Sequence, residues 1–137
     1  MYQRILVACD LSEESAELFK PALALLVPEG GELFVLHVIE PPRLVYTELM
    51  QEPYMKPDDY KAKAKEKLMT FLPETGAKVV GEVEVGNRAK QVLEYADKHH
   101  VDLIVIGRSI RKGFEKILGS TSNAVVHNAK RDVLIVK

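Results

Sequence analysis

The feature that most constrains the fold of this chain is a regular alternation of strand-sized apolar runs with segments of helical periodicity. The segments between the runs repeat apolar residues at three- and four-residue spacing, which is typical of helices that cover a sheet. Strand following helix along the whole chain predicts an α/β fold: a doubly wound parallel sheet with helices on both faces. The expected strands are residues 4–9, 32–39, 79–85, 101–106 and 132–136.

The size and charge of the chain limit what it can be. Its 137 residues suit one domain, 1–137, and 47% hydrophobic with 28% charged residues is a globular composition. A net charge of −1 gives no electrostatic reason to expect nucleic acid or an anionic membrane as partner. No apolar run has the length of a membrane span, and no signal peptide is expected. A single cysteine, Cys9, excludes an internal disulfide framework and fits a reducing cytoplasm.

Two elements carry further expectations. A helix is expected to begin after Ser12, with Glu13 and Glu14 complementing its positive end, and to be kinked at Pro21, which removes a backbone donor. The third strand alternates apolar and acidic residues, so one of its faces is exposed to water. We therefore expect this strand at an edge of the sheet.

The connection spanning residues 41–57 is too long for a simple turn and is rich in large apolar side chains. Two interpretations remain open. The segment packs against its own domain, or it forms a lid or a partner surface.

Ligands of such sheets bind beyond the carboxyl ends of the strands, where the strand order reverses. Ala8, Cys9 and Asp10 end the first strand there, and Gly107 ends the fourth. The helix that follows opens with Gly119, Ser120, Thr121 and Ser122, whose free N–H groups and hydroxyls favour an anion such as phosphate. The intervening loop is basic: Arg108, Arg111, Lys112 and Lys116. Taken alone, these residues fit an ordinary helix cap and a solvated loop equally well.

The same landmarks resemble the universal stress protein family, whose fold is flavodoxin-like. The segment from Gly107 through Gly119-Ser120 to the last strand is similar to the family's C-terminal nucleotide signature. Residues 5–12, 36–39 and 101–107 are similar to its first, second and fourth strands. The resemblance covers all 137 residues and implies a five-stranded sheet of order 3-2-1-4-5.

The resemblance also implies a site for ATP, with Mg²⁺ on the phosphates. Asp10 would hold the ribose or the metal–phosphate region, and Ala8 and Val38 would face the adenine. Gly107 would approach the ribose and phosphates, which the start of the last helix, residues 119–122, would cradle. The sequence departs from the signature in one place. Eleven residues separate Gly107 from Gly119 where the family has twelve, and the middle glycine falls on Ser109 or Ile110, so the loop cannot follow the usual path.

Three functions follow as hypotheses. The first is a non-catalytic, ATP-binding regulator of the stress response that acts as a cytoplasmic homodimer. The second is a relative that binds no nucleotide and works through contacts with another protein. The third is slow ATP hydrolysis or phosphotransfer, for which the sequence offers Asp10 but no evident general base. A phospho-receiver domain is excluded, because only Asp10 follows the first strand and Gly86-Asn87 follows the third.

The homodimer is expected to form through the last strand. Residues 133–136 are apolar on both faces, yet in the family's strand order they lie at a sheet edge. An uncovered apolar edge invites aggregation, so native proteins cover or pair it.

The remaining chemistry-bearing residues have ordinary structural explanations. Cys9 is expected to be a small core residue, and His37 a core histidine with a satisfied hydrogen bond. No spacing of His, Cys, Asp or Glu predicts a metal site, and no arrangement predicts a catalytic triad.

Overall fold

The computed structural model describes residues 1–40, 57–108 and 119–137. The alternatives for the long connection and the predictions for the loop around Ile110 lie outside the described residues. The strands are β1 (Arg4–Ala8), β2 (Glu32–Ile39), β3 (Lys78–Val85), β4 (Leu103–Gly107) and β5 (Asp132–Val136). The helices are the 3-10 helix η1 (Glu13–Leu18), α1 (Phe19–Leu25), α2 (Pro57–Phe71), α3 (Arg88–Lys98) and α4 (Ser120–Asn128).

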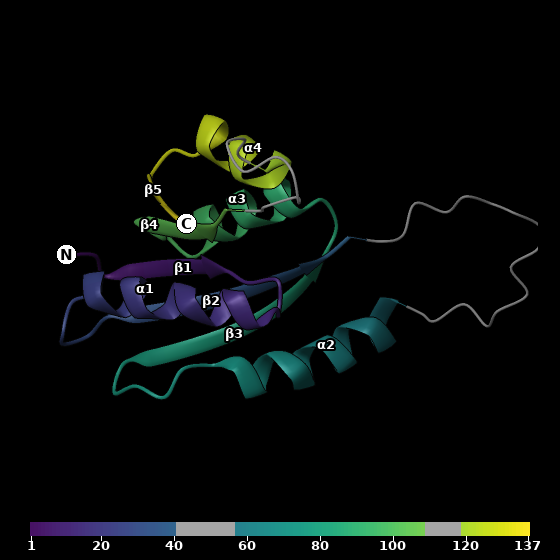
Figure 1. Ribbon diagram of the computed structural model, residues 1–137, viewed down its shortest axis with the longest axis horizontal. Helices are drawn as coiled ribbons and strands as arrows, with labels where there is room; N and C mark the ends of the chain where they lie inside the picture. The colour runs from purple at the N-terminus through teal and green to yellow at the C-terminus, as the bar shows by residue number, and fades with distance from the viewer. Residues whose placement is uncertain (41–56, 109–118) are drawn as a thin grey trace, which may run out of the picture.

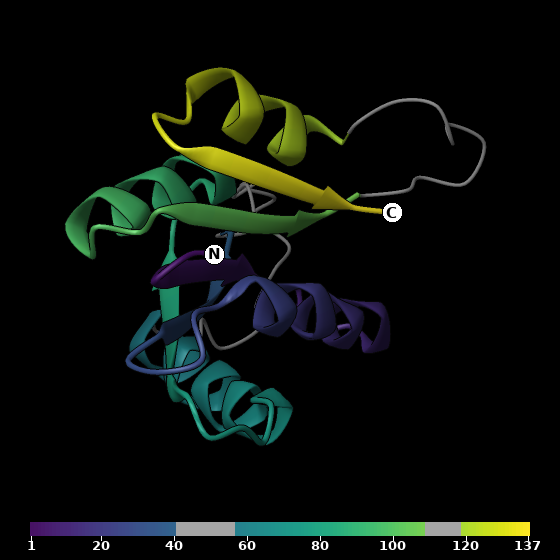
Figure 2. The same cartoon turned by 90° about the vertical axis from the view of Figure 1, so that its left-hand side faces the viewer.

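The five strands form one parallel sheet of order β3-β2-β1-β4-β5, which confirms the predicted fold. Helices α1 and α2 lie on one side of the sheet and α3 and α4 on the other (Figures 1 and 2). β3 is at one edge, as its alternating pattern predicted, and β5 is at the other. Because all strands are parallel, their carboxyl ends lie at the same end of the sheet.

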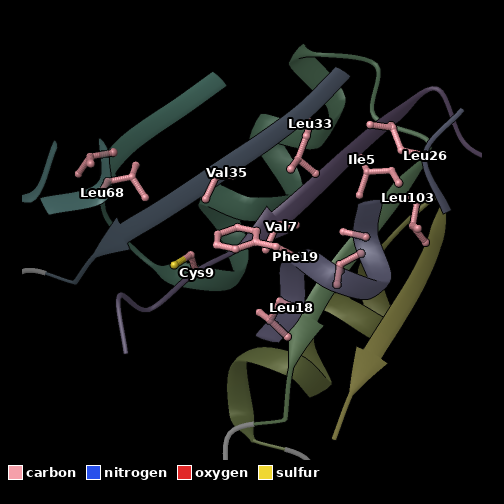
Figure 3. Packing of buried hydrophobic residues seen from close by; sticks show 13 residues of the cluster. Ile5, Val7, Cys9, Leu18, Phe19, Leu26, Leu33, Val35, Leu68 and Leu103 are labelled. Carbon is pink, nitrogen blue, oxygen red and sulfur yellow. The ribbon is translucent and has the colours of Figure 1, made fainter. Parts of the chain in front are cut away.

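Each face of the sheet has its own hydrophobic core. Ile5 and Val7 of β1 and Leu33 and Val35 of β2 point toward η1, α1 and α2, as Figure 3 shows for the first core. Leu6 of β1 and its neighbours on β2 and β4 point to the other face, where α3 and α4 cover them. Since both faces of the central strands are buried, those strands are apolar at almost every position.

The first helical segment begins as expected and changes helix type before Pro21. Ser12 is its N-cap and accepts a hydrogen bond from the Ser15 N–H. The segment is a 3-10 helix through Leu18 and becomes an α-helix at Phe19. Pro21 therefore lies in the first turn of α1, where proline is best tolerated. The kink at Pro21 stays a prediction.

Other boundaries differ by one or two residues. β1 ends at Ala8 rather than Cys9. β4 begins at Leu103 rather than at Val101, because the Val101 N–H is bonded to Ala96 O and so closes α3. At the start of α3, Gly86 has φ 149°, and Asn87 caps the helix by accepting from the Lys90 N–H at 3.0 Å.

Candidate functional site

A cavity of about 480 Å³ opens at the carboxyl ends of β1, β2 and β4. This is where the strand order reverses, because β1 is flanked by β2 on one side and β4 on the other. The volume lies within the range of small-molecule sites, roughly 300–1,000 Å³. Its floor is apolar, formed by Ala8, Leu36, Val38, Val92 and Ile106.

One wall of the cavity is the segment from Cys9 to Ser15, which is held by its own hydrogen bonds. Asp10 Oδ1 accepts from the Ser12 N–H at 2.9 Å and from the Ser12 hydroxyl. Ser15 Oγ donates to Ser12 O at 2.6 Å and lies 3.2 Å from Cys9 Sγ. Leu11, between these groups, has φ 64°, in the left-handed region. The wall is thus a tight turn that leaves the Asp10 side chain exposed at the cavity.

These contacts set the charge of the two titratable groups in the turn. Burial raises the pKa of the Asp10 carboxyl, but the hydrogen bonds from the Ser12 hydroxyl and N–H outweigh it and hold that pKa below its ordinary value. Burial also raises the pKa of the Cys9 thiol, more than its contacts with Ser15 and Leu11 lower it. At neutral pH, Asp10 is therefore a carboxylate, and Cys9 is a protonated thiol without nucleophilic character.

His37 lines the cavity beside this turn. Its Nδ1 lies 2.9 Å from Cys9 O, and since a carbonyl only accepts, Nδ1 donates. Its bond is satisfied, as expected, but the histidine is half-buried at the cavity wall rather than in the core. The strand pattern alone does not show that His37 of β2 lies beside Cys9.

The opposite wall is the first turn of α4. Gly119 is the N-cap, and no side chain caps this helix start among the described residues. The buried Ser122 hydroxyl donates to Gly107 O at 3.1 Å and so ties the turn to the end of β4. Among the described residues no side chain takes the first N–H groups of this turn, which lie with the positive end of the helix dipole at this wall.

Most of the predicted site residues meet at the cavity. Eight of them line it: Ala8, Cys9, Asp10, Val38, Gly107, Arg108, Thr121 and Ser122. Gly119 and Ser120 adjoin it in the same helix start but do not line it. The predicted basic residues Arg111, Lys112 and Lys116 lie outside the described residues.

Several polar lining residues were missed by the sequence analysis. Ser12 and Ser15 look like helix-start residues, and nothing local distinguishes Arg88 or Lys137 from other surface cations. Arg88 reaches the cavity because α3 starts there, and Lys137 because β5 ends there. Knowing that all strands end on one side would have flagged both positions.

Two further observations limit the chemistry of the described part of the chain. Residues 1–40, 57–108 and 119–137 contain no group of three or more His, Cys, Asp or Glu side chains placed to hold a metal ion. No helix in those ranges is long and apolar enough to cross a membrane.

Comparison with known proteins shows to which family the chain belongs. The model of the universal stress protein family matches residues 1–137. Universal stress protein A homolog 1 of Coxiella burnetii is 34% identical over 139 residues, covering 98% of this chain and 96% of that protein. The solved structure of hypothetical protein MJ0577 of Methanocaldococcus jannaschii is similar at a TM-score of 0.80, with 28% identity over 100% of this chain and 96% of that one.

Solved structures of similar fold include nucleotide complexes. One is the universal stress protein of Archaeoglobus fulgidus in complex with dAMP, with a TM-score of 0.64 and 24% identity over 99% of this chain and 98% of that one. An identity of 24% shows that this protein and our chain share a fold, and no more. Together with the match over the whole length, these findings place the chain in the universal stress protein family.

Proposed function

We propose that the cavity binds an adenine nucleotide, ATP with Mg²⁺, and that the protein is a non-catalytic, nucleotide-responsive regulator of the stress response. The observation that carries the proposal is the pairing of an apolar floor with the uncapped first turn of α4 in one cavity. An apolar surface suits a purine ring, and an uncapped helix start suits a phosphate. The dAMP complex of a similar fold supports a nucleotide in particular.

Each wall has a role in this proposal. The adenine lies against Ala8 and Val38, and the Asp10 carboxylate accepts hydrogen bonds from the ribose or faces the metal. The phosphates lie at the first turn of α4, residues 119–122, near the cation Arg108. Gly107, which ends β4, lines the cavity between these groups.

The divalent ion would come with the nucleotide. Because the described residues provide no cluster of three ligands, the phosphates would supply most of the coordination, and the Asp10 carboxylate would add an oxygen ligand. ATP supplies the transferable phosphoryl group. In the described wall, Asp10 Oδ1 accepts from Ser12, and His37 Nδ1 donates to Cys9 O, which leaves the other ring nitrogen as an acceptor. The function that we propose is binding without turnover, in the cytoplasm.

We further propose that the protein is a homodimer in which the β5 strands of two copies pair or pack. β5 is an edge strand, and its residues Val133 to Val136 are only half-buried in one copy. Such an edge is a template for another strand, and a second copy offers the matching one.

The test begins with the purified protein. The chain has no Trp and only five Tyr, so a retained nucleotide would shift its weak absorbance from 280 toward 260 nm. Calorimetric titration with MgATP is expected to show a heat of binding. MgATP is also expected to raise the melting temperature of the protein. If millimolar MgATP gives neither effect, the proposal fails, and the role through contacts with another protein takes its place.

A variant separates the site from the scaffold. Asp10→Ala is expected to reduce the thermal shift caused by MgATP. Asn87→Ala is the matched control: it removes the cap of α3 at the same end of the sheet and costs about 1 kcal/mol of stability, but leaves binding unchanged. Equal ligand-induced shifts in wild type and Asp10→Ala would show that Asp10 has no part in the site.

A further inference from the structure

The turn from Cys9 to Ser12 has an unfavourable backbone. Leu11 has φ 64°, a region that non-glycine residues other than Asn, Asp and His rarely occupy. Such a conformation persists only when its surroundings determine it from several sides. The groups that hold this turn therefore decide where Asp10 points.

Most of the bonds that hold the turn come from the turn itself or from η1. They include Ser12 N–H to Asp10 Oδ1 at 2.9 Å and Leu11 N–H to Cys9 Sγ at 3.4 Å. Among the described residues, one side chain from another element bonds to the turn. This is His37 of β2, whose Nδ1 donates to Cys9 O at 2.9 Å across 28 residues of sequence.

The position of this bond allows it to fix the backbone at Asp10. The Cys9 N–H is still paired to β2, through Leu36 O at 2.9 Å, but the Cys9 carbonyl lies beyond the end of β1. The peptide group that contains this carbonyl also contains the Asp10 nitrogen. Fixing the carbonyl therefore fixes the first backbone atom of Asp10.

We propose that His37 is the positioning residue for Asp10: its Nδ1–H holds the Cys9–Asp10 peptide so that the carboxylate faces the cavity. The inference rests on the proposed function, since nucleotide is what Asp10 is positioned to meet. Nδ1 carries a hydrogen whether the ring is neutral in this tautomer or charged, so the bond survives protonation of the ring. The nature of the donor, and not the charge of the ring, is what matters.

The first experiment needs no nucleotide. The pKa of the Asp10 carboxyl is measured by ¹³C NMR titration in the wild type, in His37→Phe, which has a ring without a donor, and in His37→Asn. The Asn amide lies at the same distance from the backbone as Nδ1 and can donate. We expect Phe to raise the Asp10 pKa toward its ordinary value and Asn to keep it low. Both variants remove the ring charge, so equal shifts, or no shift in either, would overturn the proposal.

The second experiment measures MgATP affinity by calorimetry. His37→Phe is expected to weaken binding about fivefold, the range of one lost hydrogen bond, while His37→Asn stays near wild type. In an Asp10→Ala background, His37→Phe is expected to have no further effect, because its target is gone. A similar loss in that background would show that His37 acts by another route.

The two experiments fail separately. If the wild type binds no MgATP, the proposed function falls, while the NMR titration still decides whether His37 positions Asp10. If MgATP binds and His37→Phe changes neither the affinity nor the Asp10 pKa, the positioning role of His37 is refuted and the proposed function stands. Should His37→Phe not give folded protein, His37→Leu, which also has no donor, takes its place in both measurements.

Discussion

The two edges of the sheet are built differently. β3 alternates apolar and acidic residues, and Glu82 and Glu84 lie 3.7 Å from Lys65 and Lys61 of α2. Lys65 also donates to the backbone carbonyl of Gly81 at 2.6 Å, so a cation covers part of this edge. β5 has four consecutive apolar residues after Asp132, and no described side chain bonds to their backbone.

Charge on an edge strand prevents pairing with another chain, and an apolar edge permits it. Within the described ranges, α2 side chains protect one edge, and nothing covers the other. The proposed association through β5 alone would give a closed pair of two copies rather than an extended assembly.

Ile135→Lys places a charge in the middle of the open edge. Since pairing through β5 would bury that charge, we expect the dimer to become a monomer, measured by sedimentation velocity at tens of micromolar. Glu82→Lys, a charge change on the other edge, is the control and leaves the dimer intact. If the wild type is a monomer, or if Ile135→Lys is still a dimer, association through β5 is refuted.

Replacing Glu82 and Glu84 together by Val makes β3 as apolar as β5. We expect light scattering to detect assemblies larger than a dimer, because both edges can then pair. Exposed ion pairs contribute only about 0–1 kcal/mol each, so the melting temperature changes little. Glu66→Val with Glu74→Val removes two exposed acids away from any strand, and equal scattering from that control would refute the explanation.

Lys65→Met keeps the length of the side chain but removes the donor to Gly81 O. We expect a loss of about 1 kcal/mol in the free energy of unfolding, measured by urea denaturation, with no change in assembly. The control is Lys63→Met, an exposed lysine of the same helix. A loss no larger than the control's would mean that the bond adds nothing.

The smallest effect concerns the start of β5, where the Tyr2 hydroxyl donates to Asp132 Oδ2 at 2.7 Å. That hydrogen bond raises the pKa of Tyr2 above its ordinary 10.0. A raised pKa favours the protonated form in the folded state, so this stabilisation is complete below pH 10 and is lost as the pH rises through the folded-state pKa. Tyr2→Phe should therefore flatten the alkaline loss of stability in thermal unfolding. An identical alkaline profile would contradict it.

The sequence predicted local features well. The bounds of β2 and β5 agree with the expected 32–39 and 132–136, because each is an apolar run bounded by turn residues. Asn87 and Ser12 cap helices as their types suggest, since a cap depends on residues only three positions apart. The change of helix type before Pro21 was missed, because it depends on how η1 packs against the sheet.

The candidate site was predicted in outline. Asp10, Gly107 and Thr121 follow strands or open a helix, and the rule that parallel strands end together brings them to one cavity. The direction of each side chain could not be predicted. Ser122, expected at a phosphate, instead donates its hydroxyl to Gly107 O, a bond that depends on the angle of α4 to β4.

Apolar periodicity and caps act over a few residues, so the strands, most helices and their order could be predicted from the sequence. Which residues form each wall of the cavity depends on contacts between distant parts of the chain. The bond from His37 to Cys9 joins residues 28 apart, and the one from Ser122 to Gly107 joins residues 15 apart. The first bond needs β1 and β2 paired in register, and the second needs α4 packed against the end of β4, so both are properties of the assembled fold.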